Sequence, residues 1–92
     1  MADKKLELRI ISPGQEIDSH VPTTADMIIL RCTTGDLGVL PGRTPCTMVL
    51  AAGDLRIIND GAEHRLTIDG GVASVERDVV TVLTEAAVLE RS

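Results

Sequence analysis

The fold class is decided most directly by residues 55–69, which read LRIINDGAEHRLTID. The segment Leu55–Ile58 is typical of a strand. Arg65–Asp69 alternates polar and apolar side chains, which is the period of a strand with one buried face. Between the two segments Asp60-Gly61 favours a tight hairpin turn, because both residues tolerate the positive φ angles that such turns need. These residues predict two paired strands.

The residues that follow continue the same pattern toward the C-terminus. Gly70-Gly71 predicts a bulge or a sharp bend in the chain, because glycine weakens a regular strand and allows unusual backbone angles. Two further strand patterns, at 72–75 and 79–83, flank a charged turn at 76–78. The strand signal is therefore dense across the whole C-terminal half.

Strand patterns also fill the N-terminal half. Residues 6–10 alternate apolar and charged side chains, and residues 27–30 form an apolar run that we interpret as a strand buried on both faces. A weaker strand is expected at 15–21, and another apolar strand at 47–51. Residues 33–45, which hold several Gly and Pro residues, form the densest turn region of the chain.

These patterns predict an all-β protein, a small antiparallel β-sandwich or flattened barrel with eight or so short strands. The 92 residues are enough for one domain and leave no room for a second. Only the last segment, 85–90, could begin a helix.

Composition excludes several classes of function. The chain has a net charge of −5 and contains no Phe, Trp or Tyr. It therefore lacks the basic surface and the stacking rings expected of a nucleic-acid-binding protein, and also the aromatic groove of a proline-rich-peptide binder. No apolar run approaches the ~20 residues of a membrane span, and no signal or transit peptide is evident, so the default compartment is the cytosol.

No catalytic or metal-binding constellation stands out. Cys32 and Cys46 do not have the spacing of a zinc site with His20 and His64, and we expect two reduced, mostly buried thiols, although a disulfide remains open. A small hydrolase that uses Cys46 or a serine rests only on scattered residues. The residues themselves favour a non-enzymatic role, with no metal, cofactor or small-molecule substrate.

Several ordered motifs resemble the epsilon subunit of bacterial F-type ATP synthase. Residues 34–45, TGDLGVLPGRTP, are similar to the hallmark glycine-rich segment of that family. The segments 52–57, 69–75 and 79–87 resemble its later strands, and 8–13 fits its opening strand. The resemblance covers nearly the whole chain at matching spacings.

The resemblance implies a sandwich of about ten strands over 1–84, and a short tail at 85–92 where the family's C-terminal helical hairpin would begin. It implies a non-catalytic rotor subunit of the central stalk that binds the gamma subunit and the c-ring. That subunit couples proton or sodium flow to ATP synthesis, as a peripheral part of a complex at the cytoplasmic face of the bacterial cell membrane. Without the inhibitory hairpin, we expect neither self-contained inhibition nor ATP binding.

The resemblance also implies contact residues. Asp36 matches an acidic position that faces the c-ring, although it could instead serve only to cap the turn, and Leu37 and Gly38 adjoin it. The candidate gamma contacts are Ser12, Arg43, Met48, Gly70 and Gly71. Arg43 could face the ring instead, and plain sheet packing is an equal alternative for the other four. Since the chain has no aromatic residue, we expect a core and an exposed gamma-facing patch built from Val, Ile, Leu and Met.

Three features depart from the family pattern. Arg43 stands where a histidine is common, the segment 16–26 is longer than usual, and the helical hairpin is absent. These departures leave open a second hypothesis, a free-standing β-sandwich that binds proteins and has no role in ATP synthase.

Overall fold

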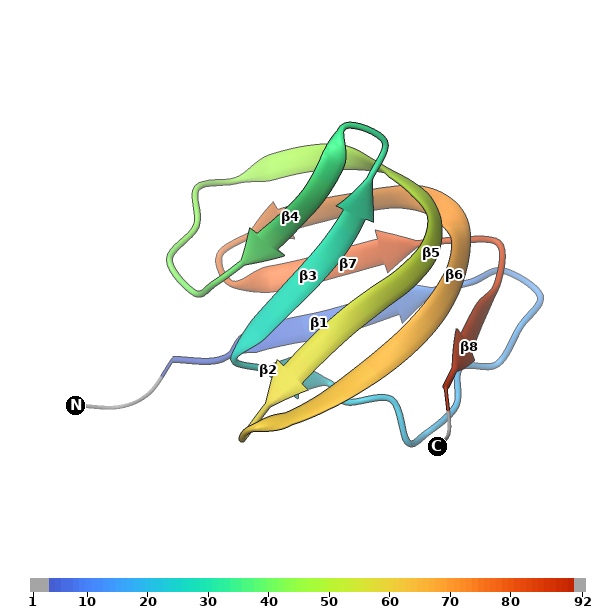
Figure 1. The fold of residues 1–92 in the computed structure, drawn as a ribbon, viewed down its shortest axis with the longest axis horizontal. Helices are drawn as coiled ribbons and strands as arrows, with labels where there is room; N and C mark the ends of the chain where they lie inside the picture. The colour runs from blue at the N-terminus through green and yellow to red at the C-terminus, as the bar shows by residue number, and fades with distance from the viewer. Residues whose placement is uncertain (1–3, 91–92) are drawn as a thin grey trace.

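A computed structural model describes residues 4–90 of the chain and contains eight strands (Figure 1). The strands are β1 (Leu6–Ile11), β2 (Thr24–Ala25), β3 (Met27–Cys32), β4 (Gly35–Val39), β5 (Cys46–Asn59), β6 (Ala62–Glu76), β7 (Val79–Leu83) and β8 (Ala87–Leu89). They pair in the order β2-β1-β7-β6-β5-β3-β4, and β8 pairs with β6. Helices are absent from residues 4–90, so the all-β prediction is confirmed.

The two long strands β5 and β6 turn this single sheet into two layers. Figure 1 shows both strands curving together around one side of the molecule, and their antiparallel register is constant from Cys46↔Val75 to Asn59↔Ala62. Along β6 the buried position changes parity, from Ile68 before the bend to Ala73 after it. Even-numbered residues of β6 therefore face the core before the bend, and odd-numbered residues face it after the bend.

The first layer contains β1, β7, the first half of β5 and the second half of β6, and is called the β7 layer. The second contains β4, β3, β8 and the remaining halves of β5 and β6, and is called the β3 layer. Aliphatic side chains from both layers form one core. Its largest fully buried side chains are Leu6, Ile28, Leu30, Val39, Leu55, Ile57, Leu66, Val75, Val80 and Val82.

Glycines allow the bend. Gly53 in β5 has a φ of 146°, and Gly70 and Gly71 in β6 have φ values of 76° and 127°. A Cβ at Gly71 would lie 2.0 Å from the carbonyl oxygen of Leu83 in β7. The predicted irregularity at 70–71 is thus a sharp bend, and the constant pairing with β5 means that it is not a bulge.

The two tight turns flanking β6 are where the sequence predicted them. Asp60 and Gly61 both have positive φ, 51° and 81°, as the type I′ turn of a two-residue hairpin requires. Arg77 and Asp78, with φ values of 50° and 64°, form the same kind of turn between β6 and β7.

Pairing differs from the prediction in two respects. There are eight strands, as the patterns predicted, where the resemblance implied about ten. The predicted strands at 47–51 and 55–58 are one strand, β5, and those at 65–69 and 72–75 are both in β6, while β2, β4 and β8 were not predicted as strands. The sheet is mixed rather than antiparallel throughout, because β1 and β7 run parallel.

The strand predicted at 15–21 is not present. Its backbone turns at Asp18, whose carbonyl accepts the N–H of Val21, and whose carboxylate accepts the N–H of His20. The Gln15 side chain, and not a backbone ladder, holds this segment: its amide donates to the Ala87 carbonyl and accepts the Ala87 N–H.

The tail at 85–90 does not begin a helix. Ala87–Leu89 is β8, paired with Leu66–Ile68 of β6, so the sheet extends beyond residue 84. Burial of Ala87 at 5% exposure, together with the two hydrogen bonds to Gln15, stabilises the extended conformation against the local helical preference.

Two other local predictions are wrong. Residues 35–39, expected as turn, form strand β4, because the turn at Thr33-Thr34 brings the chain back along β3. The apolar run at 27–30 was expected to be buried on both faces. In β3 the residues Ile28 and Leu30 are fully buried, while Met27 and Ile29 are half-buried on the outer face.

The bend gives a direct stability test. We expect Gly71→Ala to lower the free energy of unfolding by about 2–4 kcal/mol, because the added methyl group meets a β7 carbonyl and the backbone angle disfavours an L-residue. Gly14→Ala is the control. It has a positive φ of 77° but open space around it, so it should cost about 1 kcal/mol. Equal urea midpoints for the two variants would contradict the close approach at the bend.

Candidate interaction surface

No cluster of three or more His, Cys, Asp and Glu that could hold a metal occurs in the part of the chain that the structure describes. Cys32 and Cys46 are both free thiols, and burial raises the pKa of the Cys32 thiol, which keeps it protonated and weakly nucleophilic. The His20 ring lies on the surface, 2.8 Å from the Asp18 carboxylate.

The outer face of the β7 layer carries a row of exposed aliphatic side chains. Ile11 of β1 is paired with Leu83 of β7, Leu83 with Val72 of β6, and Val72 with Val49 of β5. Directly paired residues place their side chains on the same face, about 5 Å apart. These four residues, called the aliphatic row, are 51%, 47%, 42% and 58% exposed in that order. They form one continuous apolar strip across four strands.

The strip includes a shallow hollow rather than a flat surface. A depression of about 270 Å³ is lined by Pro13, Gly71, Val72, Leu83, Thr84 and Glu85. Gly71, at the bend of β6, is one of the lining residues and places no side chain in this hollow. An apolar side chain of a partner could enter the hollow and lose contact with water, which is the main favourable term in protein association.

The rest of this face is increasingly polar with distance from the row. The next register across the same strands holds Arg9, Thr81, Ser74 and Thr47. The register after that holds Glu7, Val79 and Glu76. An apolar strip with a polar rim is the usual composition of a protein–protein interface.

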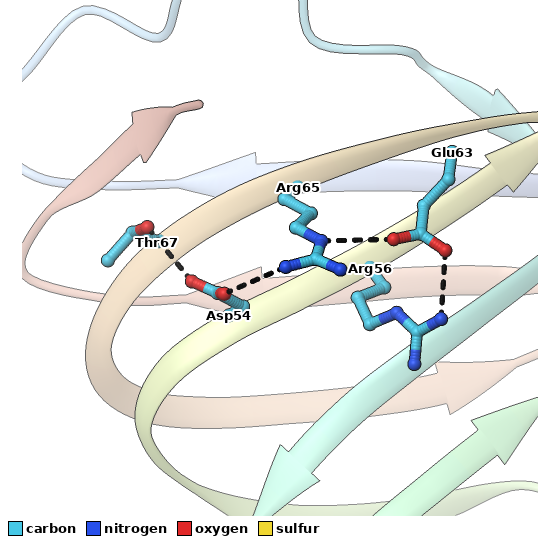
Figure 2. A network of polar contacts seen from close by, with 5 residues as sticks. All are labelled: Asp54, Arg56, Glu63, Arg65 and Thr67. Carbon is cyan, nitrogen blue, oxygen red and sulfur yellow. Dashed lines mark hydrogen bonds and ion pairs between the residues drawn. The ribbon is translucent and has the colours of Figure 1, made fainter. Parts of the chain in front are cut away.

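The outer face of the β3 layer has a different character. Its centre is a chain of charged side chains from β5 and β6, shown in Figure 2. Arg56 donates to Glu63 at 2.8 Å, and Arg65 donates to the other oxygen of Glu63 at 3.0 Å. Arg65 also lies 4.0 Å from Asp54, which accepts a hydrogen bond from the Thr67 hydroxyl at 3.0 Å. These groups neutralise one another in solvent and leave no apolar strip for a partner.

The charges also shift an ionisation. The hydrogen bond from Arg56, followed by that from Arg65, lowers the pKa of the Glu63 carboxyl from 4.5 to about 2. Glu63 therefore remains an anion well into the acid range.

The predicted c-ring residues lie on β4, at one edge of the sheet. Asp36 is exposed, and its carboxylate lies 3.8 Å from the guanidinium of its cross-strand neighbour Arg31. Leu37 packs against the core, and a Cβ at Gly38 would lie 2.9 Å from the Met27 methyl group. Of the three residues, only Asp36 presents a functional side chain to solvent.

Asp36 is close to the aliphatic row. The N–H of Thr33, in the β3–β4 turn, donates to the carbonyl of Val49 at 3.1 Å. Thr33, Asp36 and Val49 also line one shallow depression. The structure therefore places the acidic candidate next to the end of the apolar strip.

Four of the predicted gamma contacts have internal roles, which favours the packing alternative. The Ser12 hydroxyl is buried and donates to the Glu85 carbonyl at 2.9 Å. Met48 packs against the core. Gly70 and Gly71 form the bend.

Three of these four residues are next in sequence to a member of the aliphatic row: Ser12 to Ile11, Met48 to Val49, and Gly71 to Val72. These candidate contacts from the sequence therefore lie beside the exposed row, with their side chains on the other face of the strand or absent. Alternate residues of a strand share a face, so the buried Leu6 and Leu8 predict that Ser12 also faces the core. The same count does not show by itself that Ile11 belongs to an exposed row.

Arg43, the remaining gamma candidate, is exposed in the loop 40–45 between β4 and β5. This loop follows the end of β4 at Val39, whereas Asp36 lies near the start of the strand. Arg43 is therefore separated from Asp36 by the length of β4, and the structure does not bring the two together.

Comparison with known proteins identifies a family. A family model described as "ATP synthase, Delta/Epsilon chain, beta-sandwich domain" matches residues 5–90. The ATP synthase epsilon chain of Frankia casuarinae is 42% identical over 85 residues, which cover 91% of this chain and 96% of that protein. The epsilon chain of a Synechococcus strain is 40% identical over 87 residues, which cover 95% of this chain and 62% of that protein.

A solved structure agrees. A chain in the Euglena gracilis mitochondrial ATP synthase, from an assembly described as OSCP/F1/c-ring, superimposes with a TM-score of 0.81 at 27% identity, covering 92% of this chain and 53% of its own length. The present chain thus spans nearly all of one relative and between half and two thirds of the others.

The ion-pair network predicts a pH dependence. Because the pKa of Glu63 is lower in the folded protein than in the unfolded chain, its contribution is fully present above about pH 4.5 and is lost as pH falls toward 2. We expect Glu63→Gln to be less stable than the parent at pH 6, and the difference between the two to shrink by pH 2.5. Urea midpoints at both pH values measure this, and a constant difference would contradict the assignment.

Proposed function

We propose that this chain, which belongs to the family of ATP synthase delta/epsilon chains with a β-sandwich domain, is a central-stalk subunit. As such it binds the gamma subunit and the c-ring. In that role it is non-catalytic and helps to couple proton or sodium flow to ATP synthesis. The observation that carries the proposal is the aliphatic row on the outer face of the β7 layer, which we assign to gamma.

The contrast between the two outer faces supports this choice. The aliphatic row has no partner within residues 4–90 and exposes four branched side chains at adjacent positions. The outer face of the β3 layer instead carries mutually paired charges, which would lose their hydration if a partner docked there. Association through the β7 layer therefore removes more apolar surface at a smaller desolvation cost.

The fold also suits a mechanical role. A subunit that transmits rotation needs to resist deformation, and a two-layer core of close-packed aliphatic side chains is little compressible. The strands that carry the aliphatic row on their outer face also contribute Ala73, Val80 and Val82 to this core. A load on the aliphatic row is thus borne directly by the packed sheet.

Asp36 is the proposed contact with the c-ring. Its carboxylate is exposed, and Arg31 lies near enough at 3.8 Å to compensate it only in part. An anion on a rigid edge strand suits a basic or amide-bearing loop of the ring. Since Asp36 adjoins the end of the aliphatic row, one corner of the molecule could contact gamma and the ring together.

The structure has no helix long and apolar enough to cross a bilayer within residues 4–90. We propose that membrane association is peripheral, through the complex, at the cytoplasmic face of the bacterial cell membrane.

The first test concerns gamma. We expect Val72→Asp to weaken binding to the cognate gamma subunit by about tenfold or more, because it places a charge in the centre of an apolar interface. Val88→Asp is the matched control, since Val88 is 62% exposed on a strand of the β3 layer. Titration calorimetry with purified gamma measures both. Equal affinities for the two variants would refute the assignment of the face, and no binding by the parent chain would refute the role itself.

The second test concerns the ring. We expect Asp36→Lys to reduce ATP-driven ion pumping by the reconstituted complex while thermal stability and gamma binding stay near parental values. Asp69→Lys is the control, because Asp69 is an exposed carboxylate on β6. Unchanged ion pumping by the complex with Asp36→Lys would contradict the proposed contact of Asp36 with the ring.

A further inference from the structure

The loop 40–45 is held at one point by a residue that is distant in sequence. The N–H of Gly42 donates to a carboxylate oxygen of Asp78 at 2.8 Å, across 36 positions of the chain. Two exposed side chains flank this point: Leu40, which is 54% exposed, and Arg43. The Arg43 guanidinium forms no hydrogen bond or ion pair within residues 4–90, so it is available to a partner.

Asp78 adopts a backbone conformation that is uncommon for any residue other than glycine. It is the second residue of a type I′ turn, with a φ of 64°, a position that glycine fills most readily. The β5–β6 hairpin of the same molecule has glycine, Gly61, at the equivalent position of its turn. Glycine at position 78 would relieve the backbone but would remove the carboxylate that bonds to Gly42.

The anchor itself is rigid. The β6–β7 hairpin closes directly on the pair Glu76↔Val79, and the Asp78 carbonyl accepts the N–H of Glu7 in β1 at 2.7 Å. Asp78 is therefore fixed to two strands of the β7 layer. Through its carboxylate, the loop 40–45 is fixed to the same layer that carries the aliphatic row.

We propose that Asp78 is a positioning residue that holds Leu40 and Arg43 in the conformation that gamma recognises. The inference rests on the proposed function and deepens it, because it adds a second contact region at the opposite end of the β7 layer. The complementary partner surface is a carboxylate flanked by aliphatic side chains, which would take the Arg43 guanidinium and the Leu40 side chain together.

The proposal makes an unusual prediction, since stability and binding should change in opposite directions. We expect Asp78→Gly to raise the midpoint of thermal unfolding by a few degrees, because glycine relieves the positive φ. The same variant should bind gamma about fivefold more weakly, because the free loop must be ordered on binding. Hydrogen exchange of the Gly42 amide should become faster.

Two further variants separate the carboxylate from the backbone. Asp78→Asn keeps an acceptor oxygen without the charge, and should retain slow exchange at Gly42 and affinity within about twofold of the parent. Arg77→Gly relieves the same turn without touching the carboxylate, so it should raise stability and leave affinity unchanged.

The inference is overturned if Asp78→Gly binds gamma as tightly as the parent, or if Asp78→Asn loses as much affinity as Asp78→Gly. Those outcomes leave the proposed function intact, because the parent chain still binds. If the parent itself does not bind gamma, the proposed function fails and this inference fails with it.

Discussion

The bend shared by β5 and β6 is the constraint on which the rest of the molecule depends. Gly70 and Gly71 let β6 turn sharply where a side chain would strike the β7 backbone, and β5 follows because its register with β6 is constant. One sheet thereby covers its own apolar face, and a core forms without any helix or aromatic ring. The stability of the domain and the position of its two outer faces both depend on this bend.

The bend also decides which side chains reach the surface. Because burial changes parity across it, Val72 and Ala73 take roles that the alternation before Gly70 does not predict. The outer face beyond the bend carries the aliphatic row, while the outer face before it carries the network of Arg56, Glu63 and Arg65. The difference between an apolar face and a charged face is the reason why we propose the β7 layer as the docking side.

The features that could be predicted from the sequence are those that depend on residues close together in the chain. The Asp60-Gly61 turn, the bend at 70–71 and the period of β1 all depend on residues that are neighbours in the chain. Prediction from the sequence failed where a distant contact decides the outcome. Residues 87–89 are extended because they pair with β6 and because Gln15 bonds to Ala87, and neither contact leaves a local signal.

The same limit applies to the surface. The resemblance to the epsilon subunit identified the right family, and an exposed aliphatic patch on one sheet was expected. Its members could not be named, because a shift of one residue moves every side chain of a strand to the other face. The candidates Ser12 and Met48 are buried or packed on the core, whereas their neighbours Ile11 and Val49 are exposed. Only the pairing registers show which residues stand together.

The central claim, that the β7 layer is the docking face, is tested most directly by side-chain footprinting of the chain alone and in complex with gamma. The account predicts that labelling of Val49, Val72 and Leu83 falls sharply in the complex, while Val88 and Arg65 on the β3 layer label as before. Protection of Val88 and Arg65 with unchanged labelling of the aliphatic row would contradict it.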